Sequence, residues 1–148
     1  MNNLLDIRTL ALTNGIVCIS LAMCMVLVAV TRKTYPGFLE WTGASVANGI
    51  GMVLLGLRDI WPDFLTVIVS NALLMSALSI VVLGLARFTG AKSRVVFCVA
   101  PVAAVIASFA YFTYLAVDVD LRIVVFSLIG AAVLGHGVYI ERTKYAVS

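Results

Sequence analysis

Long apolar runs alternate with short polar segments along the whole chain. Five runs reach the length of about 20 residues that a helix needs to cross a bilayer, and they cover residues 10–30, 38–57, 64–85, 95–117 and 121–140. Because the segments between the runs are short, consecutive helices must lie beside one another and run antiparallel. The pattern predicts an all-α fold, a polytopic membrane helical bundle with five transmembrane helices.

The composition agrees with this fold and limits what else the chain contains. Of its 148 residues, 63% are hydrophobic and 11% are charged, and the mean hydropathy is +1.13. Soluble domains carry roughly 45–50% apolar and about 25% charged residues, and a separate soluble domain needs at least about 50 residues. We therefore expect a single integral membrane domain over residues 1–148.

The charges in the polar segments predict the orientation of the bundle. The segments after the first, third and fifth runs hold Arg32, Lys33, Arg87, Lys92, Arg94, Arg142 and Lys144, against Glu40 and Glu141. The N-terminal segment and the two remaining turns hold Asp6, Arg8, Arg58, Asp59, Asp63, Asp118, Asp120 and Arg122. Because cytoplasmic loops carry the excess of Lys and Arg, the N-terminus is expected outside and the C-terminus in the cytoplasm. The turn at 58–63 then faces outward.

Small residues recur at intervals of four in three of the runs. The sets are Gly43, Ala47 and Gly51; Ala100, Ala104 and Ser108; and Ala131 with Gly135. Membrane helices associate through close packing of small residues. We therefore expect these three faces to point into the bundle.

Three asparagines interrupt the apolar runs: Asn14 in the first, Asn48 in the second and Asn71 in the third. An unpaired amide in hydrocarbon costs several kcal/mol, so each side chain needs a partner. With a rise of about 1.5 Å per residue, Asn14 lies about 6 Å and Asn71 about 10 Å below the outer ends of their helices. Asn48 falls near the middle of the membrane.

Hydroxyl and aromatic side chains occupy the same outer half of the last two runs. They are Ser108, Tyr111, Tyr114 and Ser127. Together with the asparagines they predict a ligand-binding pocket that opens outward and is rimmed by the turn at 58–63. The rim residues are Arg58, Asp59, Trp61 and Asp63. The alternative is that the asparagines only form interhelical hydrogen bonds, which are worth about 0.6–2 kcal/mol each.

The chain offers little for catalysis or for cofactor binding. It contains no G-x-S-x-G, H-E-x-x-H or P-loop motif and no paired carboxylates inside a run. The three cysteines lack C-x-x-C spacing, and the single histidine, His136, excludes a bis-His site within one chain. We expect no catalytic residue, no cofactor and no metal, and we interpret His136 as a packed or interfacial residue. Asp118 and Asp120 beside Arg122 are typical of a solvated turn.

Several short motifs together resemble a known family. They are DIRTL at 6–10, Asn14, TYPGF at 34–38, Trp41, LGLRDIWPDFLTVIVSN at 55–71 and GLARFTG at 84–90. In this order they resemble the N-terminal multi-helix membrane region of GGDEF-type bacterial diguanylate cyclases, in which such a region precedes a cytoplasmic output domain. The likeness covers about the first 90 residues well and the last two runs loosely.

The resemblance implies a non-enzymatic sensory or regulatory input module, in the inner membrane of a bacterium, that signals to a cytoplasmic output domain or partner. The chain has no two consecutive glycines, so it holds no GGDEF motif, and cyclase activity cannot be transferred to it. We expect either a stand-alone relative or a fragment of a longer chain. The expected partners are the lipid bilayer, a second copy in a homo-oligomer and a cytoplasmic signalling protein. Nucleic acid is not expected, because the basic residues are scattered between the runs.

Three other functions remain open from the sequence. A small oligomeric transporter or channel, with its pore between subunits, would suit a neutral solute because the runs lack buried charged residues. A haem- or quinone-binding electron carrier and a structural membrane subunit are further alternatives.

Overall fold

The computed structural model describes residues 7–91, 96–116 and 118–145 and confirms the five-helix membrane architecture. The elements are α1 (Ile7–Thr31), α2 (Phe38–Gly56), the π-helix η1 (Phe64–Val69) that continues into α3 (Ser70–Thr89), α4 (Val96–Tyr114) and α5 (Val119–Tyr145). Five helices, with η1 and α3 counted as one, are long and apolar enough to cross a membrane.

The helix ends differ from the apolar runs by a few residues. The last helix continues from the end of its run at 140 to Tyr145, through a charged segment that the apolar pattern excludes. The third ends at Thr89, where Gly90 adopts a left-handed conformation with φ of 73°. Ala91 N–H donates to the carbonyl of Ala86, and Gly90 N–H to that of Arg87. These two bonds form a Schellman motif, which terminates the helix at a glycine.

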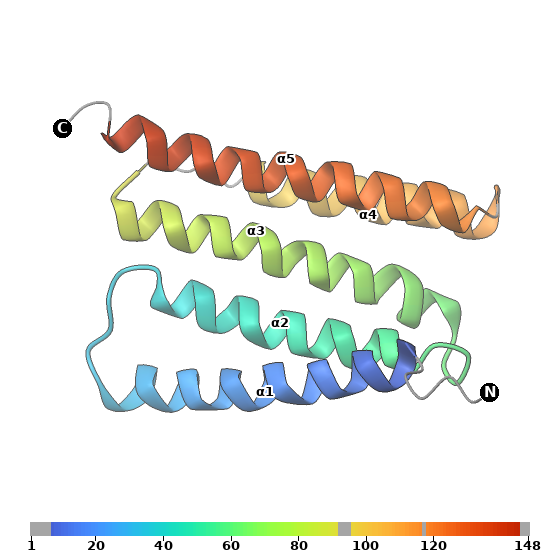
Figure 1. Ribbon diagram of the computed structural model, residues 1–148, viewed down its shortest axis with the longest axis horizontal. Helices are drawn as coiled ribbons and strands as arrows, with labels where there is room; N and C mark the ends of the chain where they lie inside the picture. The colour runs from blue at the N-terminus through green and yellow to red at the C-terminus, as the bar shows by residue number, and fades with distance from the viewer. Residues whose placement is uncertain (1–6, 92–95, 117, 146–148) are drawn as a thin grey trace.

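The helices form a row that thickens toward the C-terminus. Figure 1 shows α1, α2 and α3 side by side, with α5 beyond α3 and α4 behind α5. Within the described residues α1 packs only on α2, whereas α3 packs on α2, α4 and α5. The third span is accordingly the most buried of the five, and Met75 at its centre is fully buried. The core continues from Met75 to Val105 on α4 and Val133 on α5.

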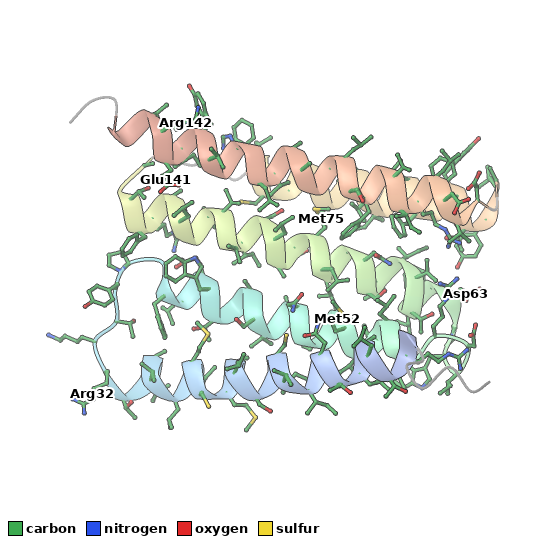
Figure 2. All side chains as sticks on the ribbon, viewed as in Figure 1. Arg32, Met52, Asp63, Met75, Glu141 and Arg142 are labelled. Atoms are coloured by element: carbon green, nitrogen blue, oxygen red, sulfur yellow. The ribbon has the colours of Figure 1, made fainter. Side chains whose placement is uncertain are left out.

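The two ends of the bundle differ in charge. Figure 2 shows Arg32, Glu141 and Arg142 at one end, which we call the basic end, and Asp63 at the other. We call the latter the turn end, because it contains the connections at 57–63 and 115–118. This grouping agrees with the antiparallel order expected from the sequence. The orientation of the two ends across the membrane stays a prediction. Asp6, Lys92, Arg94 and the side chain of Lys144 lie outside the described part.

The expectation that the small-residue faces point inward was wrong for most of them. Ala100, Ala104, Ala131 and Gly135 are exposed on the outer sides of α4 and α5, and Gly43 is exposed on α2. Gly51 alone among these glycines is buried, against the Leu74 side chain of α3. The helices approach most closely elsewhere, at Gly15 and Gly49 between α1 and α2 and at Gly84 on α3. Apolar helices give little information on which face turns inward, because most of their sides are hydrophobic.

Replacing Gly84 by alanine should destabilise the fold. A Cβ atom there would lie 2.5 Å from Trp41 Nε1 and 3.1 Å from the carbonyl oxygen of Gly37. It would also displace the indole, whose Nε1 donates to the carbonyl of Val81 at 3.2 Å. We expect the free energy of unfolding, measured by titration with sodium dodecyl sulfate, to fall by about 1–3 kcal/mol. Gly135→Ala is the matched control, because nothing lies within 4 Å of a Cβ at that position. Equal losses in both variants would contradict this packing.

Candidate functional site

Asn14 and Asn48 are linked through Cys18 at the contact between α1 and α2. The Asn48 Nδ2 atom donates to Cys18 Sγ at 3.2 Å, and Cys18 Sγ donates to Asn14 Oδ1 at 3.7 Å. Asn14 is exposed on the outside of α1, whereas Asn48 and Cys18 are half-buried. Asn48 and Cys18 line a cavity of about 420 Å³ near the middle of the bundle, with Met52, Leu74 and other mainly apolar residues.

Asn71 lies apart from this pair, in a second cavity near the turn end. This cavity has a volume of about 210 Å³. It is lined by Leu55, Arg58, Val67, Asn71, Phe109, Val119, Arg122, Ile123, Phe126 and Ser127. The structure therefore brings together three of the residues that the sequence singled out, which are Arg58, Asn71 and Ser127. We call this space the arginine cavity, because two of its four polar lining residues are arginines and none of its described lining residues is acidic.

The π-helix η1 contributes Val67 to the lining of the arginine cavity. In η1 the backbone bonds reach five residues back, as in the bond from Ser70 N–H to the carbonyl of Leu65. Side chains supply additional donors where this pattern returns to an α-helix. Ser70 Oγ donates to the carbonyl of Thr66, and Asn71 Nδ2 donates to that of Val67 at 2.7 Å. These side chains allow the irregular backbone to lie inside a membrane span. Single π-turns are frequent at functional sites.

Arg122 is the residue that the sequence reasoning missed. We expected it in a solvated turn, but its side chain is buried, with 7% of the residue exposed. The reason is the start of α5: Asp118 Oδ1 accepts the N–H of Leu121 at 3.1 Å, as a helix N-cap does. The helix therefore already includes Arg122, which lies on the same side as Phe126 and the buried Gly130, because these positions are four residues apart. The four-residue spacing of Arg122, Phe126 and Gly130 is the sequence feature from which the burial of Arg122 could have been predicted.

The guanidinium of Arg122 is only partly satisfied. Its Nη1 donates to the Thr113 hydroxyl of α4 at 3.2 Å. Its Nε is buried and has no hydrogen-bond partner among the described residues. Within the same part of the chain, the ion pairs are Arg8–Asp59 and Arg87–Glu40, and neither includes Arg122. The arginine cavity thus contains a buried charge without a paired carboxylate.

The other predicted site residues lie outside the two cavities. Ser108 Oγ donates to the Ala104 carbonyl of its own helix, and Tyr111 and Tyr114 are exposed on α4. Trp61 and Asp63 are exposed in the turn. Asp59, with φ of 69°, pairs with Arg8 and so ties the turn to the start of α1. Of the predicted rim, Arg58 alone contributes to the arginine cavity.

His136 lies toward the basic end, in a third cavity of about 260 Å³ that also includes Ser79, Cys98 and Pro101. Its ring stacks on Phe97 with a centroid distance of 4.2 Å. Within the described residues, no group of three His, Cys, Asp or Glu side chains is arranged to hold a metal ion. The stacking supports our interpretation of His136 as a packed residue.

The five long apolar helices define the chain as a multi-pass membrane protein of the helical-bundle class. Comparison with protein-family models, with curated proteins and with solved structures finds no match. The resemblance to the membrane region of diguanylate cyclases therefore stays a prediction from the sequence motifs.

Replacing Asn71 by leucine should weaken the start of the third span. The change removes the closer of two side-chain donors to the Val67 carbonyl, which lies at 2.7 Å, and leaves Ser70 Oγ at 3.4 Å. The net loss of one hydrogen bond costs about 0.5–1.5 kcal/mol. We expect that loss in the free energy of unfolding on detergent titration. Asn14→Leu makes the same change at an exposed position of α1 and should cost less than about 0.5 kcal/mol. An Asn71→Leu variant as stable as Asn14→Leu would show that the π-helix does not need the side-chain donor.

Proposed function

We propose that the chain is a non-enzymatic sensory or regulatory input module of a bacterial inner membrane. In this proposal the turn end faces outward, and a ligand binds in the arginine cavity. The basic end lies in the cytoplasm and couples to an output domain or a partner protein. The observation that carries the proposal is the buried, incompletely satisfied Arg122 in a cavity to which the π-helix contributes Val67.

The central position of α3 supports a route from the cavity to the opposite end. The third span begins at Phe64 beside the arginine cavity and ends at Thr89 at the basic end. It contacts α2, α4 and α5 on the way. A change between π and α geometry shifts the helix that follows by one residue, which is about 1.5 Å along its axis and about 100° of rotation. Such a shift in a packed helix changes the contacts of its neighbours.

The charges and the motifs support the orientation and the output. Arg32 and Arg142 lie at the basic end (Figure 2), and Arg87 lies in the last turn of α3, which ends there. Cytoplasmic loops carry such an excess of basic residues. In the family that the sequence resembles, the membrane region precedes a cytoplasmic output domain. The ends of α3 and α5 are then the surfaces at which a partner would receive the signal.

Blocking the arginine cavity should change signalling without unfolding the protein. Ser127 lines the cavity and is exposed, so Ser127→Phe fills space at little expected cost to folding. The full chain is fused at its C-terminus to a reporter whose activity depends on association, and its output is measured in cells over a panel of growth media. We expect variation between media in the parent protein and a constant output in Ser127→Phe.

The matched control is Ser20→Phe, because Ser20 is exposed on α1 and does not line the cavity. It should behave like the parent protein, and membrane levels of all three proteins should be equal by immunoblot. The same variation between media in all three would refute the cavity as the sensory site.

A small oligomeric transporter or channel is the second candidate, and one observation favours it. The exposed Ala100, Ala104, Ala131 and Gly135 leave room for another subunit to approach α4 and α5 closely. Under the sensory proposal, vesicles that contain the purified chain should take up glycerol and urea no faster than protein-free vesicles. Uptake at a higher rate, measured by light scattering after an osmotic step, would favour the channel.

A further inference from the structure

We propose that the arginine cavity is an anion site, in which Arg122 binds the carboxylate or phosphate group of a small ligand or of a lipid headgroup. The inference rests on the proposed function, because it assigns a chemical class to the ligand of that cavity. It depends on three features: the unpaired charge of Arg122, a second arginine at the same cavity and the size of the space.

The first feature is a charge that the protein itself does not neutralise. A guanidinium keeps its positive charge in proteins, and the burial of an unpaired charge is strongly unfavourable unless a counter-charge satisfies it. Thr113, the partner of Nη1, is a neutral hydroxyl. The buried Nε is left as a donor without an acceptor among the described residues. A carboxylate or phosphate in the cavity would supply the missing charge, because both groups accept bonds from a guanidinium in a fork geometry.

The second feature is a second arginine at the same cavity. Arg58 lines it from the turn after α2. Nearby carboxylates do not pair with Arg122: Asp59 pairs with Arg8, and Asp118 caps the backbone of α5. An anion in the cavity would therefore meet two arginines, and none of the described lining residues is acidic.

The third feature is size, which limits what the anion carries. The cavity of about 210 Å³ is smaller than the roughly 300–1,000 Å³ of typical drug-sized sites. Its walls are apolar at Val67, Phe109 and Phe126. A short carboxylate, a phosphate or one lipid headgroup fits this description better than an extended ligand. Val119 and Ile123 line the cavity and are also exposed on α5. In this proposal an anionic lipid headgroup of the outer leaflet therefore reaches the cavity as well as an anionic solute does.

The experiment measures anion binding to the full chain, purified in an uncharged maltoside detergent. The unfolding temperature is followed while sodium phosphate, acetate or succinate replaces sodium chloride at constant ionic strength. A ligand that binds only the folded state raises the unfolding temperature, and the rise grows with the logarithm of the ligand concentration above its Kd. A second arm compares the chain in nanodiscs of phosphatidylglycerol with nanodiscs of phosphatidylcholine. A rise with the soluble anions assigns a free ligand, and a rise with phosphatidylglycerol alone assigns a lipid headgroup; either supports the proposal.

Two variants and one control test whether the arginines are responsible. Arg122→Gln should weaken binding of the stabilising anion by about tenfold or more, since bonds to charged groups are worth about 1.5–3 kcal/mol. Arg58→Gln changes an exposed side chain, so it tests the site even if Arg122→Gln does not fold, and it should weaken binding by a few fold. Arg142→Gln removes an exposed charge from the other end of α5 and should bind as the parent does.

The anion site would be overturned if the unfolding temperature failed to rise in both arms. It would also be overturned if Arg142→Gln weakened anion binding as much as Arg122→Gln does. Failure of the anion site can be told apart from failure of the sensory function. If anions do not bind while Ser127→Phe still abolishes the variation of the reporter, the ligand belongs to another class. If Arg122-dependent binding is found but the reporter is unaffected, the cavity binds an anion without a sensory role.

Discussion

Hydrogen bonds from the side chains of Asn71 and Ser70 to the carbonyl of Val67 support the irregular backbone at the start of the third span. A backbone carbonyl inside a bilayer has no bulk water to bond, so an irregular segment there relies on donors from the protein. The third span is also the helix on which α2, α4 and α5 pack. Asn71 lines the arginine cavity as well. One amide thus takes part both in the backbone of the central helix and in the lining of the cavity.

Arg122 adds the second constraint, a charge where the fold provides no counter-charge. Its burial follows from the helix cap at Asp118, which starts α5 early enough to include it. A bundle selected only for stability would gain from an apolar residue at this position, because a buried charge costs more than it returns without a partner. A buried ionisable side chain in a membrane span is the usual starting point for a functional hypothesis. Arg122 and Val67 of the π-helix line the same cavity, so the buried charge and the irregular backbone lie at one site.

Hydropathy predicted the number and the order of the helices, because the length of an apolar run is fixed by the thickness of the bilayer. It did not predict which faces turn inward. Ala104 and Gly135 lie outside, while Gly15 and Gly49 form the close contact. The candidate site was predictable to a similar degree: Asn71 and Ser127 share a cavity, but Asn14 and Asn48 bind to Cys18 elsewhere. The depth of a residue in the membrane can be predicted from the sequence. Whether that residue faces the core or the lipid depends on tertiary packing, because an apolar helix is hydrophobic on most sides.

The packing also separates the helices by their role in the proposed mechanism. Helix α1 packs on α2 alone and is held by close glycine contacts, by Cys18 and by the ion pair of Arg8 with Asp59. It takes no part in the arginine cavity, whose described walls come from α2, η1, α3, α4 and α5. A shift of α3 would act on α2, α4 and α5, because all three helices pack against it. In the proposed mechanism the path from the turn end to the basic end runs through α3 and these three helices, while α1 contributes to the fold.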